Sequence, residues 1–246
     1  MNDRTAPDLE PLDEDWRTAL AVVAHPDDME YGAAAAVARW TSQGKRVIYL
    51  MVTSGEAGID SMDPEESRPV REAEQIASAA LVGVGTVEFL GHPDGVLEYG
   101  LPLRRDIARA VRRHRPEIVI TTNFRDTYVG AYPNQADHIA TGRAALDAAR
   151  DAGNRWVFRE LVEEGHQPWD GVRQVWAAAS PLARHAVDTT EHFDRGVASL
   201  EAHSAYLAGL GGDMADARGF LARIGESTGS RLGVRYASSF EVIPLR

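Results

Sequence analysis

The sequence contains no cysteine and a single lysine, and each scarcity excludes a class of chemistry. Without cysteine the chain has no disulfide, no thiolate ligand for a metal ion and no cysteine nucleophile. A metal ion would therefore have to be held by histidine and carboxylate side chains. Every fixed cation except Lys45 is an arginine, a bias that is typical of GC-rich bacterial genomes.

Long apolar runs and net positive charge are missing as well. No apolar run reaches the roughly 18 residues that a membrane-spanning helix needs, so we expect no membrane partner. Residues 1–16 are acidic and lack the basic start and apolar core of a secretion signal, which predicts a cytoplasmic location. The formal charge of −11 disfavours nucleic acid as a partner, because phosphate binding depends on lysine and arginine.

The length of 246 residues and the apolar content of 44% are those of a single globular domain. In the first half of the chain, short apolar runs alternate with patterns of helical period. We expect strands at residues 20–24, 46–52, 86–90 and 118–121. We expect helices at residues 29–43, 70–81, 103–114 and 137–150.

This alternation predicts an α/β fold with a Rossmann-like, mostly parallel sheet and helices on both of its faces. We predict one domain over residues 18–246, preceded by an N-terminal extension at residues 1–17. Beyond residue 154 the pattern is looser, with a strand expected at 172–178 and a helix at 192–207. The glycine-rich, polar segment 209–229 is expected to be mobile.

Polar side chains follow each of the first four expected strands. The sequences after them are His-Pro-Asp-Asp at 25–28, Thr-Ser-Gly-Glu at 53–56, Gly-His-Pro-Asp-Gly at 91–95 and, after a loop, Asp-His at 137–138. Parallel sheets of this kind bind ligands beyond the carboxyl ends of their strands. We therefore expect the reactive side chains to gather at one edge of the sheet.

His25 and Asp28 are three residues apart at the expected start of a helix, so they share a face and can bind one metal ion. Asp27 approaches the same space from another side. A catalytic zinc ion takes three protein ligands and keeps one position for water, and His138 is the best third candidate. Alone, two aspartates at a helix start would more simply be a cap that interacts with the helix dipole. The combination with a distant histidine at the same edge favours a metal site.

The motif AHPDDMEYG at residues 24–32 resembles the signature of the LmbE-like, or PIG-L, family of zinc-dependent N-acetylglucosaminyl deacetylases. The resemblance continues through TSGEAG at 53–58, REAEQIASAALVGVG at 71–85, FLGHPDG at 89–95 and ADH at 136–138. It extends, more weakly, over the C-terminal part of the chain. It implies a hydrolase that removes an N-acetyl group from an amino sugar or its conjugate, with a small N-acetylated molecule as partner.

The resemblance also implies a set of site residues. The ligands of Zn²⁺ would be His25, Asp28 and His138. Asp27 would be the general base that takes a proton from the water attacking the amide.

Arg71 and Asp94 match positions that contact substrate hydroxyls in relatives that bind sugars. From the residues alone, Arg71 is equally well interpreted as a solvated helix arginine, and Asp94 as a turn residue in Pro-Asp-Gly.

The chain departs from the family at the motif that carries the third ligand. Many relatives have His-Pro-Asp-His there, and the first histidine helps to stabilise the oxyanion; residues 135–138 of this chain are Gln-Ala-Asp-His. Gln135 can donate a hydrogen bond through its amide but cannot act as a cationic acid. Asp137 is expected to orient His138 or another nearby group. Other donors that the sequence offers for the oxyanion are Tyr132, Asn134 and His203.

Other functions remain open at this point. The chain could be an amidase for a larger amide, such as a mycothiol-type thiol conjugate, or a non-catalytic sugar-binding protein that keeps the fold. A homo-oligomer is also compatible with the sequence. A dinucleotide-binding domain is disfavoured, because two carboxylates stand where a glycine-rich turn should receive the phosphates. A serine hydrolase is disfavoured because Ser54 lacks the Gly-x-Ser-x-Gly motif.

Overall fold

The apolar runs of the sequence form one central sheet in this computed structural model, which describes residues 8–245. Within that range the sheet has eight strands in the order β1-β7-β8-β6-β5-β2-β3-β4. The strands are β1 (Glu10–Pro11), β2 (Thr18–Val23), β3 (Arg46–Met51), β4 (Val87–Phe89), β5 (Ile118–Thr122), β6 (Gln174–Ala178), β7 (His185–Asp188) and β8 (Ala237–Pro244).

The chain reverses its direction of travel through the sheet at β2. From β2 it proceeds outward through β3 to β4, and it then crosses to β5 on the other side of β2. These pairings are parallel, whereas β8 runs antiparallel to both β6 and β7. In such sheets the crevice beyond the carboxyl ends of the strands at the reversal is where ligands bind.

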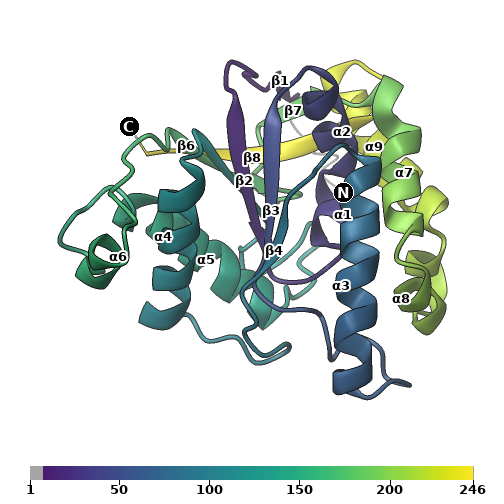
Figure 1. Ribbon diagram of the computed structural model, residues 1–246. Helices are drawn as coiled ribbons and strands as arrows, with labels where there is room; N and C mark the ends of the chain where they lie inside the picture. Colours follow the sequence, from purple (N-terminus) through teal and green to yellow (C-terminus); the bar gives the residue numbers. More distant parts are fainter. Residues whose placement is uncertain (1–7, 246) are drawn as a thin grey trace.

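Helices cover both faces of the sheet (Figure 1). The helices α4, α5 and α6 lie on one face, and α1, α2, α3, α7 and α9 lie on the other. Their bounds are α1 (Asp28–Gly32), α2 (Ala34–Ser42), α3 (Pro64–Leu81), α4 (Leu101–His114), α5 (Ala136–Asp151), α6 (Arg159–Glu163), α7 (Phe193–Glu201), α8 (Ser204–Gly209) and α9 (Ala217–Leu232). Short 3₁₀ turns occupy Thr190–His192 and Gly212–Ala215.

The predicted fold class is confirmed, and the strand β2 shows its physical basis. Leu20 and Val22 belong to the apolar cluster beneath α4 and α5, while Ala21 and Val23 belong to the cluster beneath α2 and α3. Because parallel strands in this architecture are buried on both faces, they appear in the sequence as continuous apolar runs. The four strands predicted in the first half are all present, with small shifts at their ends.

Residues 8–17 contribute to the main body of the fold. Glu10 pairs with His185, which adds β1 to the edge of the sheet beside β7. Trp16 is buried and packs edge-on against Trp40, with ring centroids 5.3 Å apart, and against Trp176 at 5.8 Å. Residues 1–7 of the predicted extension lie outside the described residues. No helix in the described part of the chain is long and apolar enough to cross a bilayer.

The two long helices predicted at 29–43 and 192–207 are each broken, so these predictions were wrong in their continuity. The first divides at Ala33, whose φ of −152° is not helical, directly after Gly32. The second divides before α8, at the fully buried His203.

The prediction of a mobile segment at 209–229 was also wrong, because α9 occupies most of it. Asp216 caps this helix by accepting a hydrogen bond from the backbone N–H of Gly219. Two glycines of α9 serve close packing: a Cβ on Gly229 would lie 2.5 Å from the carbonyl oxygen of Arg235, and one on Gly225 would lie 3.2 Å from Tyr236. Over residues 217–229 the glycines thus belong to a packed helix rather than a loop.

Candidate active site

The turn that follows β2 carries the first group of site residues and is held by α3. Asp27 has φ = 92°, a left-handed backbone that is unfavourable for a residue with a Cβ. Its N–H donates to the Gln75 side chain at 2.9 Å, and Arg71 donates to the carbonyl oxygen of Pro26 at 2.7 Å. Such strain persists where the surroundings over-determine it, and it is commonly found at functional sites.

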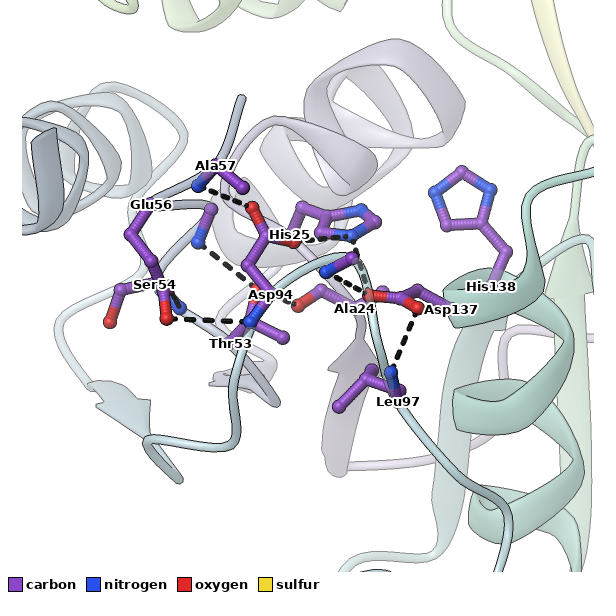
Figure 2. Close-up of polar contacts among 12 residues, drawn as sticks. Ala24, His25, Thr53, Ser54, Glu56, Ala57, Asp94, Leu97, Asp137 and His138 are labelled. Atoms are coloured by element: carbon purple, nitrogen blue, oxygen red, sulfur yellow. Dashed lines mark hydrogen bonds and ion pairs between the residues drawn. The ribbon is translucent and has the colours of Figure 1, made fainter. Parts of the chain in front are cut away.

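The three predicted metal ligands lie together. The ligand atoms of His25, Asp28 and His138 are within 4.8 Å of one another. The Nε2 atom of His138 is 2.9 Å from Asp28 Oδ1, and the two imidazole rings are 5.1 Å apart between centroids. Figure 2 shows the ring of His138 beside that of His25, above the start of α5. The sheet thus brings together residues that are more than a hundred positions apart in the sequence.

The chemistry of this cluster fits a divalent cation. Two imidazole nitrogens and one carboxylate are a common ligand set for zinc, and other transition metals also accept it. The Nε2 atom of His138 is buried and makes no contact with hydrogen-bond geometry, although Asp28 Oδ1 is 2.9 Å away, and such an atom is costly unless an ion or water binds it. Burial raises the pKa of Asp28, but His138 and His25 outweigh it and hold the pKa well below its usual value. The carboxylate is therefore ionised, as a ligand must be.

The far side of the His25 ring faces two further carboxylates (Figure 2). Its Nε2 atom is 3.0 Å from Asp94 and 3.4 Å from Asp137. Asp137 also accepts backbone hydrogen bonds from Gly95 at 2.8 Å and Leu97 at 3.1 Å, which anchor it. An N–H at Nε2 leaves the Nδ1 lone pair facing Asp28. Asp137 was expected to orient either His138 or another nearby group, and in the structure it contacts His25.

These contacts raise the pKa of the His25 imidazole. Burial lowers that pKa, but the neighbouring carboxylates of Asp137, Asp28 and Asp94 together raise it well above its usual value. Both carboxylate oxygens of Asp94 have partners in the protein: one contacts His25, and the other accepts a hydrogen bond from the N–H of Ala57 at 2.9 Å.

The Asp27 carboxylate is buried next to this cluster, with an exposed fraction of 5%. Burial raises its pKa to about 6, against the opposing charge of Arg71, whose guanidinium is 3.1 Å away. Arg71 is 1% exposed and stacks on Tyr206, 3.8 Å from the ring centroid. In this structure Arg71 thus contacts the predicted base, and its predicted contact with substrate hydroxyls stays a prediction.

Behind Asp27 lies a buried polar cluster that the sequence analysis missed. Gln75 donates to Glu30 at 3.0 Å, and Ser78 donates to the same carboxylate at 2.7 Å. Burial raises the pKa of Glu30 to about 7. The sequence pattern that could have revealed this cluster is the helical spacing of the polar residues Arg71, Gln75 and Ser78, which all lie on the buried side of α3.

The alternative oxyanion donors have different surroundings. His203 is fully buried, with its Nε2 3.8 Å from Glu30. The amide nitrogen of Asn134 donates to two backbone carbonyls, those of Asn123 and Arg125. Tyr132 is 72% exposed on the loop before α5. Gln135 is exposed at the N-cap position of α5, where its side chain makes no capping hydrogen bond, and it lies three residues before His138.

Comparison with known proteins agrees with this geometry. Residues 20–149 match the family PIG-L, described as GlcNAc-PI de-N-acetylase. The chain is 24% identical over 232 residues to diacetylchitobiose deacetylase of Thermococcus kodakarensis, covering 94% of this chain and 84% of that protein.

A second relative is a 1D-myo-inositol 2-acetamido-2-deoxy-alpha-D-glucopyranoside deacetylase from Kineococcus radiotolerans. It is 31% identical over 207 residues, which are 70% of this chain and 54% of the relative's length. Among solved structures, N,N'-diacetylchitobiose deacetylase from Pyrococcus horikoshii has a TM-score of 0.85 at 24% identity, covering 94% of this chain and 85% of its own. That likeness concerns the fold.

Proposed function

The chain belongs to the PIG-L family of GlcNAc-PI de-N-acetylases, and we propose that it is a zinc-dependent hydrolase that removes the N-acetyl group from a small amino-sugar substrate. The observation that carries the proposal is the convergence of His25, Asp28 and His138, with the buried Asp27 carboxylate beside them. Family membership supports the deacetylase activity, and the donor set supports the metal.

The residues that would hold the cation are His25, Asp28 and His138. When bound there, a divalent cation supplies a Lewis acid that polarises the amide carbonyl and makes water more acidic. The neutral imidazole nitrogens and the ionised Asp28 carboxylate are the ligand forms that such a cation requires.

Asp27 would act as the general base. Its carboxylate accepts a proton from the attacking water as the new C–O bond forms at the amide carbon. It returns this proton to the nitrogen as the C–N bond breaks, so that acetate and a primary amine leave. Burial brings the Asp27 pKa close to neutral pH, which suits a group that must both accept and release a proton.

The negative charge on the carbonyl oxygen needs a hydrogen-bond donor as well as the cation. We assign this role to the side-chain amide of Gln135, because the residue is exposed at the start of α5 near His138. One such donor is typically worth about 3 kcal/mol of transition-state stabilisation. Asp94 and Arg71 are the proposed contacts for sugar hydroxyls, and both lie next to ligand or base side chains.

The test is acetate release by the metal-loaded protein from N-acetylglucosamine, diacetylchitobiose and an N-acetylglucosaminyl inositol. We expect release from at least one of them, and release at least about 100-fold slower after replacement of Asp27 by Asn. If the protein holds stoichiometric metal and yet releases no acetate from any of the three, the amino-sugar assignment is wrong. Release of a larger acid from a thiol-conjugate amide would instead identify an amidase.

A further inference from the structure

The two ring nitrogens of His138 meet different surroundings. Nε2 lies 2.9 Å from Asp28 Oδ1 but outside hydrogen-bond geometry, whereas Nδ1 lies 3.1 Å from the Asn134 side-chain oxygen and 2.9 Å from the Tyr128 hydroxyl. A neutral imidazole carries one N–H, and only its other nitrogen has a lone pair for a cation. Nε2 can therefore be a ligand only when the hydrogen is at Nδ1, and the acceptors there compete for it with the Asp28 carboxylate beside Nε2.

The orientation of the Asn134 amide is set by its other contacts. Its nitrogen donates to the carbonyl oxygen of Asn123 at 2.7 Å and to that of Arg125 at 2.9 Å, which uses both of its hydrogens. Its oxygen accepts the backbone N–H of Gln135 at 2.8 Å. A flipped amide would place oxygen against two carbonyls and NH₂ against an N–H. The oxygen must therefore face His138.

Tyr128 contacts the same nitrogen but does not select a tautomer. A hydroxyl can either donate or accept, so it is compatible with both forms of the imidazole. The Asn134 oxygen can only accept. Of the two groups at Nδ1, only Asn134 requires the N–H to be there.

Asn134 is also fastened to the loop that precedes α5. The backbone N–H of Asn134 donates to the carbonyl oxygen of Asp126 at 2.9 Å. The backbone N–H of Tyr128 donates to the carbonyl oxygen of Tyr132 at 2.8 Å. Asn123, at the start of this loop, donates to Thr127 at 3.0 Å. The conformation of the loop thus holds the amide in place.

We propose that Asn134 is a positioning residue for the metal site: its amide oxygen accepts the Nδ1–H of His138 and so keeps the Nε2 lone pair free for a divalent cation. This inference rests on the proposed metal-dependent function. Groups that bind the outer nitrogen of a metal-ligating histidine typically change metal affinity about 10–100-fold when they are removed.

The first experiment needs no substitution at Asn134. In the metal-free full chain labelled with ¹⁵N-histidine, the ring-nitrogen shifts report the tautomer of each imidazole, and the His138 signals are assigned by their loss in His138→Gln. We expect the Nδ1–H form at neutral pH. Observation of the Nε2–H form in the unaltered chain would overturn the proposal, whether or not any variant folds.

The second experiment measures zinc affinity by competition with a chelator, together with the same NMR signature. We expect Asn134→Ala to bind zinc about 10–100-fold more weakly and to shift His138 toward the Nε2–H form. Asn134→Asp keeps the acceptor and removes the donors, so its affinity should stay closer to that of the unaltered chain. Tyr128→Phe is the matched control, because it removes the other contact at Nδ1 and should retain the Nδ1–H form.

The outcomes separate this proposal from the proposed function. If the unaltered chain binds zinc and Asn134→Ala binds it equally well, the positioning role is refuted and the metal site stands. Equal weakening in Asn134→Asp and Asn134→Ala would mean that the donors matter rather than the acceptor, and would also refute it. If the unaltered chain binds no metal ion, the failure belongs to the proposed function.

Discussion

Asp27, the proposed general base, is held in place and tuned by its neighbours. Its left-handed backbone and buried carboxylate are both unfavourable, and both are stabilised by side chains of α3: Gln75 binds its N–H, and Arg71 binds its carboxylate. Burial raises the pKa, and the Arg71 charge limits the rise to about 6. A carboxylate with this pKa is mostly ionised at neutral pH and can still take up a proton there.

Replacing Asp27 by Asn should lower kcat by about 10²–10⁴, because an amide cannot accept the proton of the attacking water. Bound metal should remain, since the three ligands are untouched. Steady-state kinetics with metal analysis on the same sample check both statements. Asp13→Asn, at an exposed position, is the control and should keep full activity. A variant at Asp27 that retains half of kcat would remove the residue from the mechanism.

At the scale of single elements, buried polar side chains join helices to one another. Arg112 of α4 is 2% exposed, and its guanidinium donates to the carbonyl oxygens of Ala152, Asn154 and Val157 at 3.2, 2.9 and 2.9 Å. These carbonyls lie after the end of α5, in the segment that leads to α6. The arginine is a shared donor that holds this segment against α4.

Arg112→Met should therefore destabilise the protein by about 1–3 kcal/mol, because the carbonyl oxygen of Val157 loses its donor. The carbonyl oxygens of Ala152 and Asn154 keep the backbone N–H groups of Trp169 and Val157. Urea denaturation measures the change. Arg113→Met on the same helix is the control, since Arg113 is 42% exposed in its ion pair with Glu88. An exposed pair of this kind contributes about 1 kcal/mol at most. Similar losses of unfolding free energy in Arg112→Met and Arg113→Met would contradict this role of Arg112.

His203, at the break between α7 and α8, is fully buried, and its burial makes the free energy of unfolding depend on pH. Burial, and then the charge of Arg71, lower its folded-state pKa to about 3, from an unperturbed value of 6.5. The unfolded chain therefore binds a proton below pH 6.5 that the folded chain does not. This contribution to stability is complete above pH 6.5 and is lost as the pH falls below it. The neighbouring Glu30, whose pKa is raised, acts in the opposite sense below about pH 7.

His203→Leu should remove this loss. Between about pH 7.5 and about pH 5.5, the unaltered chain should lose about 1.4 kcal/mol more unfolding free energy than the variant. Urea midpoints and slopes at the two pH values test the difference. A histidine outside this cluster, His166, replaced by Gln, is the control for general effects of removing an imidazole. Parallel pH profiles for the unaltered chain and His203→Leu would refute the assignment.

At the scale of the whole molecule, the proposed metal ligands come from two segments of the chain that are adjacent only because the sheet places them together. His25 and Asp28 follow β2, whereas His138 lies in α5 after β5, and β2 and β5 are parallel neighbours at the reversal of strand order. A cation at this point would tie the two halves of the first α/β region to each other. Binding to the folded state alone must also stabilise it.

Removal of the metal by a chelator should consequently lower the melting temperature, and zinc should restore it. With free metal at 100 times Kd the stabilisation is about 2.7 kcal/mol. For a chain of this size that corresponds to a shift of about 5–10 °C. Differential scanning calorimetry measures it. His138→Ala should melt at one temperature with or without chelator, and a chelator shift that persists in this variant would mean that the ion binds elsewhere.

The sequence alone was sufficient for the strands β2 to β6, for the helices α3, α4 and α5, and for the edge that carries the chemistry. It did not predict β1, β7, β8 or α9. Continuous apolar runs predict strands buried on both faces, and the polar motifs that end these runs must meet where parallel strands end. The motif at residues 24–32 added the identity of the ligands by resemblance, and the structure brings those ligands together.

Only the tertiary structure decided what surrounds those residues. The contact of Asp137 with His25, the hold of Arg71 and Gln75 on Asp27, and the acceptor at Nδ1 of His138 depend on the relative positions of loops and helices. Periodicity determines which side of an element is buried, because burial follows from that element's own residues. It does not determine which distant side chain makes contact with a given residue, because that depends on strand order, crossovers and the close packing of the assembled core.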